Sequence, residues 1–166
     1  MGNYQTRFGS IDAFDKGGVD VIKDDPKNYA FSNVYEVAAT SAPYERVCVA
    51  KNFEYVIEAT RAEGTSPWYE HAHDEFVVNM EDVEVVVELV KLDNTDHIDP
   101  DLEGARLVDG EPTGKFMGRL FLARGHMGLL PEGAAYRFVS GKPATLILQS
   151  IDGAVTQHRW SDICQK

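Results

Sequence analysis

The sequence predicts an all-β domain, a barrel or sandwich that follows an irregular N-terminal arm. Two observations support this prediction. From residue 46 to residue 151, short runs rich in β-branched and aromatic residues alternate with turn-forming residues, and no part of this region keeps a helical period. The length of 166 residues and the hydrophobic fraction of 43% suit one domain with a substantial core.

The chain divides into three zones by composition. Residues 1–45 are polar and irregular and form the arm, and residues 46–151 form the barrel. Residues 152–166 form a C-terminal tail that we expect to pack on the barrel and to contain one short helix near Trp160 to Ile163.

Glycine and proline interrupt the arm repeatedly. Two weak apolar runs, Val19 to Ile22 and Val34 to Val37, fit either short strands or a helical turn. Aromatic residues are spread through the arm without a regular pattern: Tyr4, Phe8, Phe14, Tyr29, Phe31 and Tyr35. Because aromatic side chains anchor interfaces, we expect the arm to contact a neighbouring subunit. Disorder, or packing on its own barrel, are the alternatives.

The predicted strands of the barrel share a high content of β-formers. They cover residues 46–51, 53–59, 75–79, 83–90, 115–123, 126–130, 135–139 and 144–151. Turn signals separate them at residues 80–82, 124–125, 131–133 and 140–143. Within 83–90, Val83, Val85, Val87 and Leu89 fall on one face, and Glu84 and Glu88 fall on the other. Many short strands with regular turns are typical of sandwiches and barrels.

The stretch from residue 94 to residue 114 breaks this pattern, because it is acidic and holds two prolines and three glycines. We expect a long surface loop between strands, and loops of this length are often functional or flexible. Its aspartates resemble a calcium loop, but the glycine and the terminal glutamate are not at the required spacing, which argues against calcium. These aspartates are Asp96, Asp99 and Asp101. The isolated histidines His97 and His158 are expected to face solvent.

Charge and composition exclude several classes of partner. The formal net charge is −11, with 16 Lys and Arg against 27 Asp and Glu, so nucleic acid and anionic membranes are excluded as main partners. No apolar run approaches the roughly 20 residues that span a bilayer, and the first residues do not resemble a signal peptide. Cys48 and Cys164 are expected to be free thiols in a reducing cytoplasm.

The first chemical motif lies between Gly64 and Glu75. It contains His71 and His73, two positions apart, followed by Glu75. On a strand, side chains at i and i+2 project from the same face, so both imidazoles can meet one cation. Two histidines and one carboxylate form the ligand set that suits iron(II) and leaves positions open for substrate and oxygen.

The second motif runs from Gly125 to Tyr136. Pro131 and Gly133 are expected to turn the chain into the strand that begins near Tyr136.

Together the two motifs resemble those of the cupin family. The first family motif runs G-x5-H-x-H-x3 or 4-E-x6-G, and the second runs G-x5-P-x-G-x2-H-x3-N. His71-x-His73 and Gly125-x5-Pro131-x-Gly133 match, while six residues rather than five separate Gly64 from His71. The resemblance implies a cupin-type jelly-roll β-barrel, and it fixes no single reaction because this barrel hosts many chemistries.

The sequence departs from the family pattern at three places. Glu75 follows His73 after one residue, Tyr136 replaces the histidine of the second motif, and Ser140 replaces its asparagine. A phenol titrates near pH 10 and is a poorer ligand than imidazole at neutral pH. The resemblance therefore implies a degenerate metal site of His71, His73 and Glu75 with Tyr136 in place of the fourth ligand. Replacing Tyr136 by His is expected to raise its metal affinity.

Two interpretations of the histidine pair remain open. In the first, the pair and Glu75 hold a metal with an unusual fourth ligand, for which His126 is a candidate. In the second, the histidines lie in the barrel mouth, are hydrogen-bonded to Glu75, Tyr136 or water, and bind no metal tightly.

The segment from Pro67 to Phe76 and the overall length resemble the small subunit of two-component hydroquinone 1,2-dioxygenase. This family pairs a small cupin with a larger chain that carries iron. The resemblance implies a non-catalytic subunit, a larger cupin-containing catalytic partner that holds iron(II), and opening of an aromatic small molecule, hydroquinone, to 4-hydroxymuconic semialdehyde. Trp68 and Tyr69 are candidates for contact with the partner or a pocket, and packing at the barrel rim is the alternative for Trp68.

Two further functions remain possible from the sequence. One is a self-sufficient metal-dependent cupin, a dioxygenase, isomerase or lyase that works as a homodimer. The other is a metal-free binding or scaffold protein. The self-sufficient enzyme requires one tightly held metal per chain and turnover without a partner, whereas the subunit requires its partner.

Overall fold

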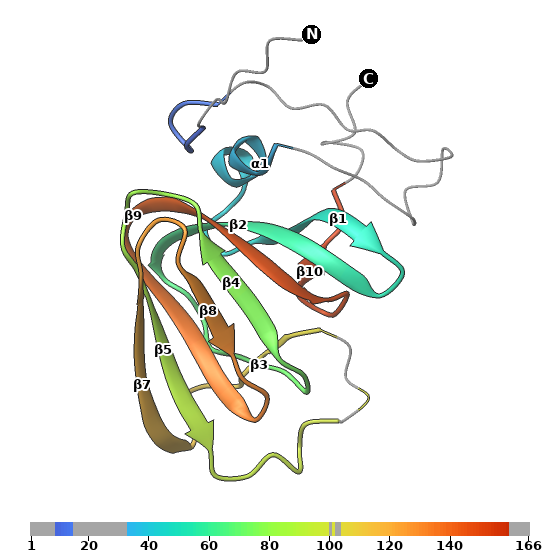
Figure 1. The fold of residues 1–166 in the computed structure, drawn as a ribbon. Coiled ribbons are helices and arrows are strands. Elements are labelled where there is room, and N and C mark those ends of the chain that lie inside the picture. Colours follow the sequence, from blue (N-terminus) through green and yellow to red (C-terminus); the bar gives the residue numbers. More distant parts are fainter. Residues whose placement is uncertain (1–8, 15–32, 100, 102–103, 160–166) are drawn as a thin grey trace, which may run out of the picture.

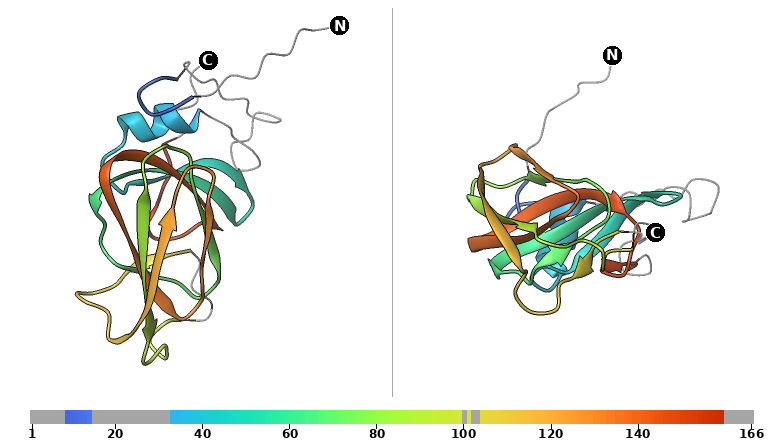
Figure 2. Two further views of the ribbon diagram at one scale, coloured as in Figure 1. Left: turned by 60° about the vertical axis from the view of Figure 1, so that its left-hand side comes forward. Right: turned by 90° about the horizontal axis from the view of Figure 1, so that it is seen from below.

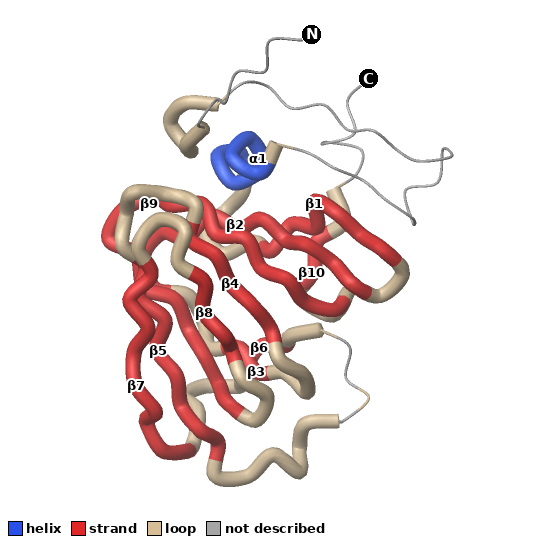
Figure 3. Tube along the Cα trace, viewed as in Figure 1, coloured by secondary structure: helices blue, strands red, loops and turns tan. Residues whose placement is uncertain are grey.

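The computed structural model describes residues 9–14, 33–99, 101 and 104–159, in which one helix and ten strands are found (Figure 1). The helix is α1 (Val34–Thr40). The strands are β1 (Arg46–Asn52), β2 (Tyr55–Thr65), β3 (Tyr69–Glu70), β4 (Glu75–Asn79), β5 (Val85–Leu92), β6 (Arg106–Leu107), β7 (Gly114–Leu122), β8 (Met127–Leu130), β9 (Ala134–Ile151) and β10 (Thr156–Gln157). The strands wrap around a common interior (Figures 2 and 3), and the predicted all-β, cupin-type jelly-roll fold is confirmed.

The long strand β9 holds the two halves of the barrel together. Its first part pairs with β5, from Ala134 to Ser140, and its second part pairs with β4, from Leu146 to Gln149. Along most of its length it also pairs with β2. Side chains from both halves meet in one core that includes Tyr136, Phe138 and Leu146. A single strand shared by both halves explains why one apolar core fills the barrel.

The turn predicted at residues 140–143 is wrong, because β9 continues through it. The register of β2 and β9 shifts here: Ala62 pairs with Ala144 but Gly64 pairs with Ser140. This two-residue advance on β2 against four on β9 is a β-bulge, which bends a strand without ending it. Proline is tolerated at such a bulge, where its missing N–H is not needed by the ladder. The turn residues therefore mark a bend between the two halves.

The end of the arm packs on its own barrel. Asn33 caps α1, and its side chain accepts hydrogen bonds from the backbone of Tyr35 at 3.0 Å and Glu36 at 3.3 Å. The helix buries Val37 and Ala38, and Val37 packs on a small cluster formed by Val47 and Val49 of β1 and Ala59 of β2. Figure 1 shows α1 across the end of the barrel near β1 and β2. Of the two structures predicted for 34–37, the helical turn is therefore the observed one.

Other expectations are met in part. The strand predicted from residue 53 starts at Tyr55, because Phe53 lies in the β1–β2 turn with a φ of 57° and an exposure of 78%. In the tail, β10 pairs in parallel with β1, so Thr156 and Gln157 lie beside Arg46 and Val47. Residues 19–22, the helix expected near 160–163 and Cys164 lie outside the described residues. No helix among the described residues has the length and apolarity needed to cross a membrane.

Candidate functional site

The spacing of His71 and His73 predicted that both lie on one strand, but in the structure they do not lie on a strand. β3 ends at Glu70 and β4 begins at Glu75, and the four residues between them bend. Nδ1 of His71 is hydrogen-bonded to the carbonyl oxygen of His73, which holds the bend. The two imidazoles still lie close together, with ring centroids 5.6 Å apart and planes at 62°. His71 is fully buried and also packs edge-on against Tyr136, with centroids 5.3 Å apart.

A buried charge network occupies the barrel interior next to this pair. The guanidinium of Arg46 donates from Nε to Glu58 at 2.6 Å, from Nη1 to the Tyr136 hydroxyl at 2.8 Å and from Nη2 to Glu75 at 3.0 Å. Arg46 is 3% exposed, and Glu58 and Glu75 are both 0% exposed. The Tyr136 hydroxyl donates to Oε2 of Glu75. Four strands, β1, β2, β4 and β9, thus converge on one guanidinium.

Two further hydroxyls complete the hydrogen bonding of this network. The hydroxyl of Ser150 donates to Oε1 of Glu75, and that of Thr156 donates to Oε1 of Glu58 at 2.7 Å. Both carboxylates are therefore engaged at both oxygens. Full satisfaction matters, because a buried carboxylate without partners is strongly destabilising.

Burial and the guanidinium set the protonation of these groups. Burial acts to raise the pKa of Glu75, but Arg46, His71 and the hydroxyls of Ser150 and Tyr136 outweigh it and lower this pKa to about 2. Burial also raises the pKa of Tyr136 well above its ordinary value of 10. At neutral pH the network thus combines an ionised Glu75 with a protonated phenol that donates to it.

The pKa of Glu75 predicts how stability depends on pH. A carboxyl whose pKa falls from 4.5 to about 2 on folding stabilises the folded state fully above about pH 4.5. That contribution, roughly 3 kcal/mol, is lost as the pH falls from about 4.5 to about 2. We expect the difference in unfolding free energy between the parent and Glu75→Gln to shrink over this interval. Glu84→Gln, at an exposed position, is the matched control, and a pH-independent difference for Glu75→Gln contradicts the expectation.

The residues present do not fit a metal ion as they stand. No group of three or more His, Cys, Asp or Glu side chains in the described part of the chain is arranged to hold one. Nε2 of His71 and both ring nitrogens of His73 are buried without a hydrogen-bond partner, so the imidazoles could offer ligand atoms. Glu75 cannot, because both its oxygens are engaged, and its Oε1 lies 4.0 Å from Nε2 of His73.

The structure does not bring His126 to this set. β8 runs antiparallel to β4, so Leu130 pairs with Glu75 and Met127 with Val78. His126 therefore lies at the Asn79 end of β4, roughly 13 Å along the strand from Glu75 at about 3.3 Å per residue. Its side chain is exposed, and its Nδ1 accepts a hydrogen bond from the backbone of Ala123 at 3.3 Å. The suggestion of His126 as the fourth ligand is therefore wrong.

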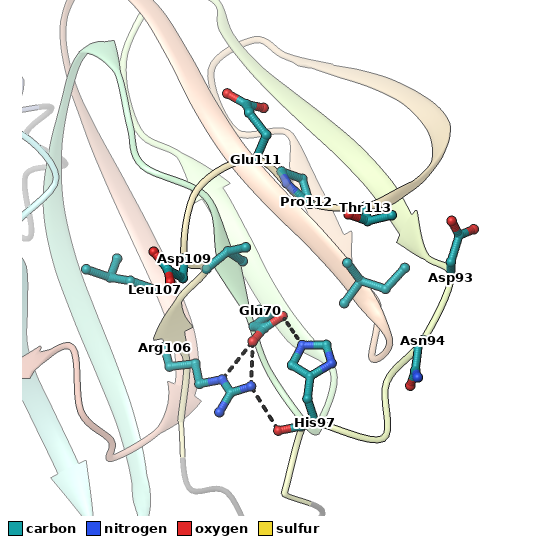
Figure 4. A pocket seen from close by; sticks show the side chains of 12 residues that line it. Glu70, Asp93, Asn94, His97, Arg106, Leu107, Asp109, Glu111, Pro112 and Thr113 are labelled. Carbon is teal, nitrogen blue, oxygen red and sulfur yellow. Dashed lines mark hydrogen bonds and ion pairs between the residues drawn. The ribbon is translucent and has the colours of Figure 1, made fainter.

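The loop between β5 and β7, called the acidic loop below, lines a separate pocket of about 560 Å³ together with Glu70 and Leu92. Figure 4 shows Glu70 at its centre, where Oε1 accepts from Nε of Arg106 at 2.7 Å and Oε2 lies 3.0 Å from Nε2 of His97. Glu70 is 3% exposed, whereas the His97 side chain is 52% exposed. His97 thus faces solvent as predicted, but it also pairs with a buried carboxylate that the sequence did not single out.

Trp68 and Tyr69 lie on opposite sides of the sheet. Trp68 is 7% exposed, its Nε1 donates to Glu111 at 2.9 Å, and the guanidinium of Arg137 lies 4.4 Å from its ring centroid. Tyr69 is 3% exposed and stacks on Tyr136 inside the barrel, with centroids 5.4 Å apart. Within the described chain, Trp68 packs under the acidic loop and Tyr69 packs in the core.

Sequence reasoning missed the central residue of the site, Arg46. A signal was present, because Arg46 and Glu58 are charged residues on β1 and β2, whose other buried side chains are mostly apolar. Charged residues are almost never fully buried unless they are paired. The sequence did not show the pairing, because Arg46 and its partner Tyr136 are 90 positions apart.

Comparison with known proteins identifies close relatives among solved structures. Hydroquinone 1,2-dioxygenase from Sphingomonas sp. TTNP3, with 4-hydroxybenzoate bound, has a chain that is 58% identical over 99% of both chains, with a TM-score of 0.86. Hydroquinone 1,2-dioxygenase PnpCD, in complex with Cd²⁺ and 4-hydroxybenzonitrile, has a chain that is 47% identical over 98% of both chains, with a TM-score of 0.85. No protein-family model matches the sequence, and no curated protein matches it.

A more distant match shares only the fold. PnpCD in complex with Fe³⁺ contains a chain that is 14% identical, with a TM-score of 0.57 over 82% of this chain and 37% of that one. The two close matches, by contrast, extend over nearly all of this chain and of its relatives. On that identity and coverage, the chain belongs to the hydroquinone 1,2-dioxygenase family.

Proposed function

We propose that this chain is the small, non-catalytic subunit of an iron(II)-dependent dioxygenase that opens hydroquinone to 4-hydroxymuconic semialdehyde. In this proposal, a larger cupin-containing partner holds the iron. The observation that carries the proposal is the 58% identity over 99% of both chains to a chain of hydroquinone 1,2-dioxygenase. In a cupin metal site, Glu75 would be a metal ligand. Here the buried guanidinium of Arg46 is hydrogen-bonded to Glu75, which supports a non-catalytic role.

The difference in length between two PnpCD chains supports a larger partner. This chain matches 98% of one PnpCD chain but only 37% of another, which is more than twice as long as this one. The longer chain contains a region with the same fold. A small cupin and a longer chain with a similar domain therefore fit one two-subunit enzyme.

The ligands of the relatives support a phenolic substrate. The Sphingomonas enzyme binds 4-hydroxybenzoate, and PnpCD binds 4-hydroxybenzonitrile. Both ligands are phenols that carry a substituent opposite the hydroxyl, as hydroquinone does.

We also keep the expectation of a reducing cytoplasm, in which the buried thiol of Cys48 is free.

The test is reconstitution from separate chains. We expect neither this chain nor the larger chain alone to open hydroquinone at the rate of the mixture, measured by oxygen uptake and product formation. We also expect iron to co-purify with the larger chain. Turnover by this chain alone, with one metal per chain, would instead establish the self-sufficient homodimer, and full activity of the larger chain alone would remove the need for this subunit.

A truncation tests the arm as a contact with the partner. Deletion of residues 1–32 keeps α1 and therefore keeps Val37 and Ala38 on the barrel. The deletion also removes Ile11, which is 9% exposed and whose backbone N–H donates to Glu81 at 2.6 Å, so we expect the unfolding free energy to fall by about 1–3 kcal/mol while the barrel stays folded. We expect the truncated chain to bind the larger chain at least tenfold more weakly. Unchanged binding and activity would show that the contact lies elsewhere.

A further inference from the structure

The buried network resembles a metal site in which the guanidinium of Arg46 takes the place of the metal ion. Arg46 makes one bond each to Glu58, Glu75 and Tyr136, and these come from three different strands. Two of the three acceptors, Glu75 and Tyr136, are the positions of the first and second cupin motifs that correspond to metal ligands. Arginine suits this place, because its guanidinium is always charged, is less strongly hydrated than an ammonium and presents several donors in a fixed plane.

The two histidines and Glu75 differ in how many of their polar atoms form hydrogen bonds. Three imidazole nitrogens are buried without partners, Nε2 of His71 and both nitrogens of His73. Buried polar atoms are normally paired, so these nitrogens indicate an incomplete site. Glu75, 4.0 Å from His73, is by contrast fully engaged by Arg46, Tyr136 and Ser150. The imidazoles are available to a cation, and the carboxylate is not.

We infer that Arg46 is the resident cation of this barrel and that it closes a latent divalent-metal site formed by His71, His73 and Glu75. A divalent ion bound to Glu75 would lie beside the buried guanidinium, and two cations in a low-dielectric interior repel each other strongly. The guanidinium also occupies the carboxylate oxygen that faces His73. Exclusion of metal therefore depends on Arg46 more than on the tyrosine at position 136.

This inference changes the expectation for Tyr136→His. With Arg46 in place, a new imidazole at position 136 still faces the guanidinium that Nη1 now directs at the phenol. We expect Tyr136→His alone to gain no metal, and Arg46→Met to gain it with the tyrosine retained. Methionine keeps much of the apolar stem of arginine, so the variant removes the charge and the donors while filling part of the volume.

The test is Co²⁺ binding to the purified chain, measured by equilibrium dialysis and by the visible absorption of the bound ion. We expect Arg46→Met to bind one Co²⁺ per chain at least tenfold more tightly than the parent or Tyr136→His. The double variant Arg46→Met, His73→Ala should lose this gain. Arg124→Met is the matched control, because Arg124 pairs with Asp82 at 3.0 Å on the surface, away from the network.

Folding is monitored by near-ultraviolet circular dichroism, because Arg46→Met leaves two buried carboxylates without a cation. The second variant, Arg46→Met, Glu58→Gln, removes one of these charges and keeps Glu75. If either variant folds and gains no Co²⁺, or if the parent binds Co²⁺ as tightly as Arg46→Met, the inference is wrong. Failure of both variants to fold in saturating Co²⁺ also contradicts it, because an ion that replaced the guanidinium should restore the fold.

Discussion

Arg46→Met is expected to lower the unfolding free energy by about 3–5 kcal/mol, measured by denaturant unfolding at pH 7 without metal. The reason is the loss of the only cation that contacts both Glu58 and Glu75 among the described residues. Removing one partner of a buried ion pair leaves an uncompensated charge, which costs more than the pair contributes. The hydroxyls of Ser150, Thr156 and Tyr136 remain, but they carry no charge to replace the guanidinium.

A double-mutant cycle of Arg46→Met, Glu58→Gln and the double variant measures the interaction energy between Arg46 and Glu58 separately from the other effects of each substitution. Adding Glu58→Gln to Arg46→Met should recover part of the lost stability, because one of the two unpaired charges is removed. The control Arg124→Met should change the unfolding free energy by less than about 1 kcal/mol, because its pair with Asp82 is on the surface. A loss for Arg46→Met as small as that of the control would mean that the network does not stabilise the fold.

Trp68→Ala is expected to cost about 3–5 kcal/mol of unfolding free energy, because it removes a large buried side chain. Its indole is 7% exposed and forms a cluster with Val90, Leu92, Ile98 and Ala135. Ile98 of this cluster belongs to the acidic loop, and the backbone of Val108 in the same loop donates to the carbonyl of Trp68 at 3.0 Å. Amide exchange at Val108 should therefore become faster as the loop loses its support.

Trp68→Phe provides the matched control for this substitution. It keeps an aromatic ring beneath Arg137 and removes the hydrogen bond to Glu111, whose side chain is 80% exposed. We expect a loss of no more than about 1.5 kcal/mol. Binding of the larger chain distinguishes the two roles open to Trp68: weaker binding by a stable Trp68→Phe variant indicates contact with the partner, and unchanged binding indicates packing alone.

The all-β fold could be predicted from the sequence because its signals are local. Alternation such as Val85, Val87 and Leu89 depends on residues two positions apart, and all three are buried in the barrel core. Turn signals are local as well, but whether such residues end a strand depends on how the strand pairs with its neighbours. Ser140 to Pro143 have the composition of a turn, yet the pairing of β9 with β2 continues on both sides of them and makes them a bulge within β9.

The sequence by itself therefore determined the fold class, the order of most strands and the resemblance to a damaged metal motif, because each of these depends on neighbouring residues. Only the tertiary structure showed which residues contact His71, His73 and Glu75 of that motif. The bend at His71 and His73 replaced the expected strand, and Arg46 reached Glu75 and Tyr136 across 29 and 90 positions. Spacing cannot show such contacts, because strands far apart in the sequence become neighbours only when the barrel closes and their buried charges must pair.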